Sequence, residues 1–240
     1  MRVLDLFSGI GGFSLGLERA GMKTVAFCEI EEYPRKVLAK HWPEVPCYED
    51  IRELSGERLA ADGIAVDLIC GGYPCQPFST AGKRAGKEDD RHLWPEYLRL
   101  IRELRPSWVI GENVAGHISM GLDDVLSDLE GEGYAWEAFV IPACAVQLPQ
   151  GRQRIWFVAD TMRRDKKVAR LFARGRWEPE QISWDQMGEM QTTPDMVGVP
   201  DGLPHRMDRL KALGNAVVPQ IPEMIGRAIM ALSTSPVSEP

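Results

Sequence analysis

A cysteine between two prolines is the first residue in this chain whose setting could support chemistry. Cys75 lies in the loop Gly71–Ser79, directly after an apolar run typical of a buried strand. Pro74 and Pro77 stiffen this loop, and ligand sites of open α/β sheets lie beyond the carboxyl ends of strands. A cysteine there can be partly exposed and tuned to its thiolate, the nucleophilic form. Most single cysteines are inert packing residues, so this prediction depends on the loop.

A carboxyl group and two arginines follow at positions that suit the same sheet edge. Glu112 and Asn113 end the next apolar run and are therefore expected beside Cys75. A buried carboxyl near an anion can have a raised pKa and act as a proton donor, although a strand-end acid can equally cap the next turn. Arg152 and Arg154 alternate before a later strand, so both face one side, where they suit an anionic substrate or an ion pair with Glu112.

A glycine-rich turn near the N-terminus indicates a site for a nucleotide-like ligand. The run Asp5–Phe13 reads DLFSGIGGF, and glycines there let the backbone approach a ligand and leave helix N–H groups free. Glu29 closes the second expected strand, where an acid can grip both ribose hydroxyls. Asp50, at the end of the third, could hold an adenine amino group. The turn has no phosphate-binding lysine, so S-adenosylmethionine fits better than ATP.

Strand-like and helix-like segments alternate along the first half of the chain. Strands are expected at 3–7, 24–29, ending near 50, at 65–70 and at 108–111, and helices at 13–20, 32–41, 51–61, 93–104 and 122–131. This alternation predicts an α/β fold with a parallel sheet and right-handed crossovers. Strands at 135–141 and 155–159 have no helix between them, which predicts an antiparallel pair at one edge. Pro222 suits the first turn of a closing helix over 221–232.

Composition places the chain among ordinary globular proteins. Of 240 residues, 44% are hydrophobic and 26% charged, and no apolar stretch approaches the roughly 20 residues of a membrane helix. The N-terminal run does not resemble a signal peptide. Five cysteines without a C-x-x-C pair argue against a zinc site or a disulfide framework and for a reducing compartment. We therefore expect a cytoplasmic protein without a metal.

The charge distribution permits a nucleic-acid partner without requiring one. The net charge is −7, whereas phosphate contacts need Lys and Arg. Residues 163–176 nevertheless hold seven basic side chains against one acid, Asp165. Such a run suits either a solvated helix face or a contact with phosphate.

Five sequence blocks together resemble the carbon-5 cytosine DNA methyltransferases, and the resemblance covers nearly the whole chain. The blocks are DLFSGIGGF at 5–13, GGYPCQPFSTAGKRAG at 71–86, ENV at 112–114, QGRQR at 150–154 and GNAVVP at 214–219. They occur in the family's order with plausible spacing. The resemblance implies a Rossmann-like methyltransferase fold and S-adenosylmethionine as the cofactor.

The resemblance also implies a role for each matched residue. Cys75 matches the nucleophile, Glu112 the acid that contacts the cytosine ring nitrogen, and Arg154, with Arg152 nearby, the base-site arginine. The implied cofactor contacts are Phe7, Gly9, Gly11, Gly12, Glu29, Ile30, Asp50, Ile51, Pro74 and Asn215. The implied substrate contacts are Gln76, Ser79 and Asn113, of which the first two belong to a loop that closes over DNA.

One departure concerns the segment expected to recognise the target sequence. Family members usually have a sizeable region between the arginine block and the GN block, whereas here the interval is 161–213. We therefore expect a cofactor-binding and catalytic core at 1–160, a reduced target-recognition segment at 161–205, a return to the core at 206–232 and a frayed tail at 233–240. The basic run is expected to contact phosphate.

Three functions remain open on the sequence. The first is DNA methylation on a flipped-out base, with double-stranded DNA as partner; the compact size suits a phage-borne enzyme or one from a restriction-modification system with a cognate restriction nuclease. The second is cytosine methylation in transfer RNA, which one branch of the family performs with the same blocks. The third is a non-catalytic DNA-binding relative, and the intact Cys75, Glu112 and arginines argue against it.

Overall fold

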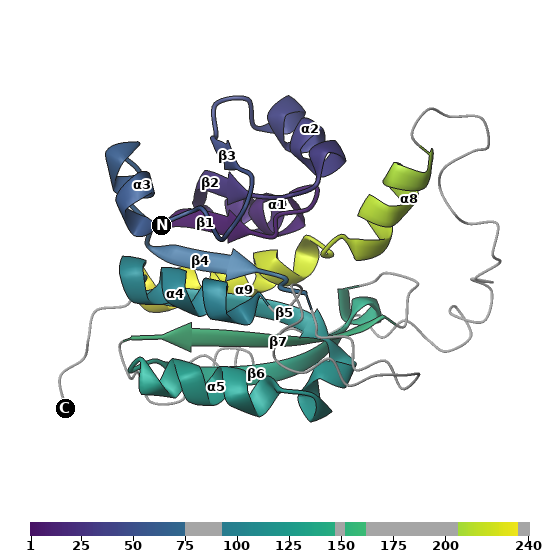
Figure 1. Cartoon of the computed structure of the whole chain (residues 1–240). Coiled ribbons are helices and arrows are strands. Elements are labelled where there is room, and N and C mark those ends of the chain that lie inside the picture. The colour runs from purple at the N-terminus through teal and green to yellow at the C-terminus, as the bar shows by residue number, and fades with distance from the viewer. Residues whose placement is uncertain (75–92, 147–151, 162–205, 235–240) are drawn as a thin grey trace, which may run out of the picture.

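The described part of the chain forms one seven-stranded sheet (Figure 1). The computed structural model describes residues 1–74, 93–146, 152–161 and 206–234. The strand order is β3-β2-β1-β4-β5-β7-β6. The strands are β1 (Arg2–Leu6), β2 (Lys23–Cys28), β3 (Cys47–Tyr48), β4 (Leu68–Gly71), β5 (Trp108–Val114), β6 (Ala135–Pro142) and β7 (Gln153–Asp160).

The sheet is parallel except at β7. The pairs β2–β3, β1–β2, β1–β4 and β4–β5 are parallel, and β7 is antiparallel to both β5 and β6. The predicted α/β class with a mostly parallel sheet and an antiparallel pair near one edge is therefore confirmed. Because β7 runs against β5, the start of β7 lies at the same sheet edge as the end of β5, with Val114 opposite Arg154.

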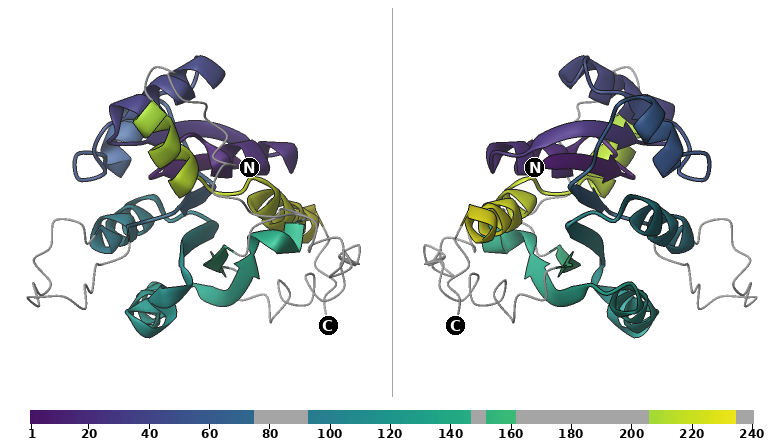
Figure 2. Two further views of the ribbon diagram at one scale, coloured as in Figure 1. Left: turned by 90° about the vertical axis from the view of Figure 1, so that its right-hand side faces the viewer. Right: turned by 90° about the vertical axis from the view of Figure 1, so that its left-hand side faces the viewer.

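Helices cover both faces of this sheet (Figures 1 and 2). They are α1 (Gly12–Arg19), α2 (Glu32–His41), α3 (Gly56–Ala61), α4 (Trp94–Leu104), α5 (Leu122–Gly131), α8 (Arg206–Asn215) and α9 (Gln220–Thr234), with short 3-10 turns η1 (Ala115–Ser119) and η2 (Ala143–Val146). One core lies under α3, α4 and α5, and a second lies under α1 and α9. None of the helices in the described ranges is long and apolar enough to cross a membrane.

The apolar spacing of α9 explains why this helix returns to the sheet. Ile221, Ile225, Ile229 and Leu232 recur at helical spacing and are all buried. Each such side chain contributes about 1.5–3 kcal/mol when fully removed from water. Helix α9 packs on α1, where Gly226 allows close approach because a Cβ there would lie 2.8 Å from the Cβ of Ala20.

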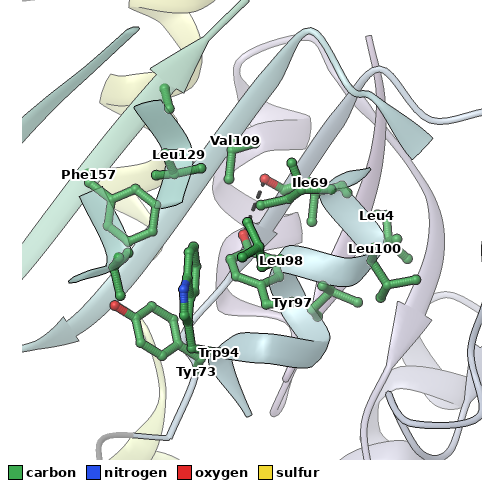
Figure 3. Close-up of a cluster of buried hydrophobic side chains, with 14 of the residues drawn as sticks. Leu4, Ile69, Tyr73, Trp94, Tyr97, Leu98, Leu100, Val109, Leu129 and Phe157 are labelled. Carbon is green, nitrogen blue, oxygen red and sulfur yellow. Dashed lines mark hydrogen bonds between the residues drawn. The ribbon is translucent and has the colours of Figure 1, made fainter. Parts of the chain in front are cut away.

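An aromatic cluster on the α4 side supports the chain just before Cys75 (Figure 3). The ring of Tyr73 lies 5.3 Å from that of Trp94, and Trp94 lies 5.4 Å from Tyr97. The Tyr97 hydroxyl donates a hydrogen bond of 2.9 Å to the carbonyl of Ile110 in β5. The cluster thus ties the end of β4, the start of α4 and β5 together.

The element boundaries expected from the sequence differ from the structure in three informative places. Strand β5 continues through Val114, three residues beyond its expected end, because its pairing with β7 extends that far. The helix expected over 51–61 begins only at Gly56, after Ser55 caps it by accepting a hydrogen bond of 3.1 Å from the N–H of Arg58. The GN block, expected as a turn, ends helix α8, which the sequence did not predict.

Candidate active site

A cavity of about 390 Å³ lies at the carboxyl ends of the parallel strands. Its walls come from the segments after β1, β2 and β4, from the ends of β5 and α8, and from the start of β7. The lining residues are Phe7, Gly9, Glu29, Ile30, Glu31, Pro34, Gly72, Tyr73, Pro74, Leu93, Glu112, Asn113, Val114, Arg152, Arg154, Ala212, Asn215 and Ala216. Ligand sites of open α/β sheets occur at this edge.

Glu29 organises the part of the cavity near the glycine turn. Its Oε2 accepts a hydrogen bond of 2.7 Å from the N–H of Gly9, and its Oε1 accepts one of 2.8 Å from the N–H of Glu31. Burial raises the pKa of this carboxyl, and the two N–H donors oppose that rise. Gly9 has a φ of 53°, and no atom lies within 4 Å of where a Cβ would be. Each Glu29 oxygen keeps a lone pair for a further donor such as a ribose hydroxyl.

The other two glycines of the turn serve packing and do not line the cavity. Gly11 has a φ of 85°, and a Cβ there would lie 2.6 Å from the ring of Trp42. A Cβ on Gly12 would collide with the carbonyl oxygen of Val217. The sequence placed both among the cofactor contacts, whereas the structure gives them contacts with α2 and with the turn before α9.

Glu112 and Arg154 form an ion pair in the second part of the cavity. Arg154 Nε lies 2.9 Å from Glu112 Oε1, and both side chains are largely buried. Burial raises the pKa of Glu112, while Arg154 and Arg152 act against that rise. Gly72 packs closely against this carboxyl, since a Cβ on it would lie 3.0 Å from Glu112 Oε2. A carboxyl in this setting can hold a proton and pass it to a bound base.

Arg152 has a different partner from Arg154. Its Nη1 donates a hydrogen bond of 3.0 Å to the carbonyl of Ala216, in the turn after α8. Burial, followed by the neighbouring charge of Arg154, lowers the pKa of Arg152. Both arginines of the QGRQR block line the cavity, but Arg154 contacts Glu112 in β5 whereas Arg152 contacts the turn after α8.

Asn113 and His117 hold the strand end that leads to Cys75. Asn113 Nδ2 donates a hydrogen bond of 3.1 Å to the carbonyl of Tyr73, and Asn113 Oδ1 accepts one of 2.8 Å from the N–H of Val114. The hydroxyl of Tyr73 lies 2.8 Å from Nε2 of His117, and both residues are buried. The Asn113 amide, expected to contact the substrate, thus fixes the backbone beside it.

Several predicted site residues lie elsewhere. Asp50 does not line the cavity, and its Oδ1 accepts a hydrogen bond of 2.9 Å from the N–H of Arg52. Ile51 is buried in the core, and its carbonyl accepts a hydrogen bond of 2.8 Å from Arg99. The catalytic candidate Cys75, the substrate candidates Gln76 and Ser79, and the basic run at 163–176 lie outside the described residues.

Sequence reasoning missed some residues that line the cavity or support it. The missed lining residues are Glu31, Pro34, Gly72, Tyr73, Leu93, Val114, Ala212 and Ala216. Tyr73 and Ala216 lie inside the sequence blocks at 71–86 and 214–219, so the sequence indicated their segments although not the residues themselves. The contact between Tyr73 and His117 joins residues far apart in the chain and gave none.

The cavity fits an adenosine-bearing cofactor with a cationic sulfonium centre. Its volume lies within the range of about 300–1,000 Å³ typical of small-molecule sites. Two carboxyl groups, Glu29 and Glu31, line the part next to the glycine turn, and their oxygens suit hydrogen bonds from ribose hydroxyls. Within the described ranges, no group of three or more His, Cys, Asp or Glu side chains is arranged to hold a metal ion.

Comparison with known proteins identifies the family. Residues 1–198 match the family model described as C-5 cytosine-specific DNA methylase. The Type II methyltransferase M2.BsuMI of Bacillus subtilis is 34% identical over 192 residues, which are 75% of this chain and 46% of that protein. M.Eco47II of Escherichia coli is 38% identical over 166 residues, 65% of this chain and 39% of that protein. The chain thus spans about half or less of the length of these curated relatives.

A solved structure shares the fold. The crystal structure of a proposed DNA modification methyltransferase encoded within an E. coli prophage superposes with a TM-score of 0.58 at 30% identity. The match covers 67% of this chain and 46% of that chain. With its blocks in order, its sheet topology and a family match over most of its length, the chain belongs to the C-5 cytosine-specific DNA methylases.

Proposed function

We propose that the protein transfers a methyl group from S-adenosylmethionine to carbon 5 of cytosine in double-stranded DNA, through a covalent adduct of Cys75 with a flipped-out base. One observation carries the proposal. Gly9 and Glu29, which suit the cofactor, line the same cavity as Pro74, Glu112 and Arg154, which suit the base. Cys75 follows Pro74 directly in the sequence.

The first step is addition of the Cys75 thiolate to carbon 6 of cytosine. The sulfur–carbon bond forms while the electrons of the 5,6 double bond move to carbon 5, and Glu112 gives its proton to ring nitrogen 3. The raised pKa of Glu112 keeps this proton available, and Arg154 holds the carboxyl in place at 2.9 Å. Carbon 5, otherwise too electron-poor to attack, becomes an enamine carbon.

Methyl transfer and release complete the cycle. S-adenosylmethionine would supply an electrophilic methyl group to carbon 5, and its sulfur would keep the electrons of the broken sulfur–methyl bond and leave as the neutral thioether S-adenosylhomocysteine. Loss of the carbon-5 proton to a base then expels the cysteine thiolate and restores the double bond, and the proton on nitrogen 3 returns to Glu112. These atoms are inaccessible in a stacked duplex, so the base must leave the helix to enter the cavity.

DNA is the proposed substrate because the matching family model is described as C-5 cytosine-specific DNA methylase and the similar prophage-encoded structure as a DNA modification methyltransferase. The seven basic residues at 163–176 would contact phosphates. A cognate restriction nuclease would be a partner if the enzyme belongs to a restriction-modification system, as the Type II names of its relatives indicate for those proteins.

Expression in a methylation-free bacterial host tests the proposal. The genome is mapped for 5-methylcytosine after expression of the wild type or of Cys75→Ser. We expect a mark at a defined sequence with the wild type and no mark with the variant. Purified protein is assayed in parallel with labelled cofactor on duplex DNA and on transfer RNA. Methylation of transfer RNA alone, or of neither, would overturn the proposal.

A further inference from the structure

One wall of the cavity is formed by the end of α8 and the residue after it. Ala212, Asn215 and Ala216 all face the cavity. Helix α8 stands at the side of the sheet toward which β4 points, apart from the layer made by α1 and α9 (Figure 1). Residues 211–216 are called the α8 wall below.

Arg152 holds one end of the α8 wall. Its Nη1 donates to the carbonyl of Ala216 at 3.0 Å, and its side chain is partly buried. The backbone of Arg152 is itself fixed, because its carbonyl accepts a hydrogen bond of 2.9 Å from the N–H of Ala143. A charged donor on a fixed backbone makes a stronger and better-placed hydrogen bond than a neutral one.

Lys211 forms the contact at the other end of the α8 wall. Its Nζ lies 2.6 Å from Glu31 Oε1, and the N–H of Glu31 donates to Glu29 Oε1 at 2.8 Å. The Lys211 and Glu31 side chains are 60% and 47% exposed, so the contribution of this pair is expected to be smaller than that of Arg152. Lys211 therefore connects α8 to the carboxylate proposed to bind ribose.

The turn that follows the wall packs tightly against α1. A Cβ on Gly12 would collide with the carbonyl oxygen of Val217, and one on Gly16 would collide with that of Pro219. This close packing fixes the chain after Ala216. Leu213, within the wall, is 53% exposed, and the contacts of Arg152 and Lys211 join the wall to two other sides of the cavity.

We propose that Arg152 and Lys211 are positioning residues that hold the α8 wall against the cofactor part of the cavity. They then determine how tightly the cofactor binds, whereas Glu112 and Arg154 determine the chemical step. This inference rests on the proposed function, because it assumes that the cofactor binds between Glu29 and Asn215. It also gives different roles to Arg152 and Arg154, which the sequence places together in one block.

Binding of S-adenosylhomocysteine without DNA, measured by calorimetry, tests the inference. Arg152→Met should weaken binding by about tenfold, the effect of one charge-assisted hydrogen bond. Arg152→Lys, which keeps a charged donor, should recover part of this loss. Lys211→Met should weaken binding by about two- to fivefold. The matched control is Lys36→Met, because Lys36 makes a 2.6 Å pair with Glu32 that is similarly exposed and lies outside the cavity.

Steady-state kinetics distinguish a role in positioning the cofactor site from a role in overall stability, because only the first changes the Michaelis constant and the turnover number unequally. In Arg152→Met and Lys211→Met, the Michaelis constant for the cofactor should rise by more than the turnover number falls. Arg154→Lys should show the opposite pattern, with slower turnover and a similar cofactor affinity. If Arg152→Met does not fold, Arg152→Lys and Lys211→Met decide the question.

The outcomes separate this inference from the proposed function. If the wild type binds S-adenosylhomocysteine and the Arg152 and Lys211 variants bind it as tightly as Lys36→Met does, the positioning role is wrong and the proposed function stands. If the wild type neither binds this ligand nor methylates DNA, both proposals are overturned.

Discussion

At the scale of single residues, the proposed proton donor Glu112 is a carboxyl group that is both buried and paired with an arginine. Burial favours the protonated form of Glu112, and Arg154 at 2.9 Å favours the ionised form. The raised pKa shows that burial prevails. Arg154 thus holds the carboxyl of Glu112 in place while the pKa of Glu112 stays raised, as the proposed role of proton donor requires.

Replacement of this acid by glutamine should slow the chemical step. A side-chain amide cannot transfer a proton to ring nitrogen 3, so we expect Glu112→Gln to lower the single-turnover methylation rate by about 10²–10⁴-fold. Affinity for S-adenosylhomocysteine should stay within about twofold, because the glycine turn and Glu29 are unchanged. Methylation at the wild-type rate would show that Glu112 is not the proton donor.

A second buried acid, Asp5, should make the stability of the protein depend on pH. Asp5 is fully buried, accepts hydrogen bonds from the hydroxyl and the N–H of Ser14 at 2.7 and 3.2 Å, and has its pKa raised from 3.8 to about 7, chiefly by burial. Between pH 3.8 and about 7, Asp5 therefore keeps its proton in the folded state, whereas it has lost the proton in the unfolded chain. The stabilisation is complete below pH 3.8 and is lost as pH rises to about 7, by about 4 kcal/mol in total.

Asp5→Asn tests this dependence, since the amide cannot ionise and its oxygen can still accept from Ser14. Urea unfolding at pH 5 and pH 8 should show that the wild type loses more stability over this interval than the variant does. Equal losses in the two proteins would mean that Asp5 does not titrate in the folded state.

At the scale of elements, α1 and the turn before α9 meet through glycines. A Cβ on Gly16 would collide with the carbonyl oxygen of Pro219, so Gly16→Ala should destabilise the protein by about 1–3 kcal/mol. Gly131, in α5, has no atom within 4 Å of a Cβ position, and Gly131→Ala is the matched control. Urea unfolding should show a loss only for Gly16→Ala, and equal stabilities would contradict the packing.

Local sequence patterns predicted most of the elements, and the misses have physical causes. Helices α2 and α5 lie where the apolar spacing placed them. The end of β5 was missed because it depends on pairing with β7, which lies about forty residues later. Helix α8 was missed because its last two residues, Gly214 and Asn215, are typical of turns.

The site residues also divide into those that local sequence predicts and those that depend on contacts between distant segments. Glu29, Pro74 and Glu112 each follow or end a parallel strand, so the topology alone places them at one edge and all three line the cavity. Asp50 also follows a strand but hydrogen-bonds within its own turn. The contact between Arg152 and Ala216 could not be predicted, because it depends on where α8 lies.

At the scale of the whole molecule, a chain with a net charge of −7 would need a local concentration of positive charge to bind the proposed DNA substrate. Replacement of Arg163, Arg164, Lys166 and Lys167 by glutamine should weaken DNA binding and reduce the slope of log affinity against log salt by up to about 4. Binding of S-adenosylhomocysteine should not change. An unchanged salt slope would show that the basic run does not contact phosphate.

One cavity is proposed to bring a cysteine thiolate, a carboxyl proton and a methyl donor to the same cytosine. Duplex DNA in which the target cytosine carries fluorine at carbon 5 tests it directly, because the adduct cannot be resolved when no proton is available to leave. With S-adenosylmethionine, the wild type should form a stable protein–DNA complex, and peptide mass spectrometry should place the bond at Cys75. Absence of a complex, or an adduct that persists in Cys75→Ser, would contradict the account.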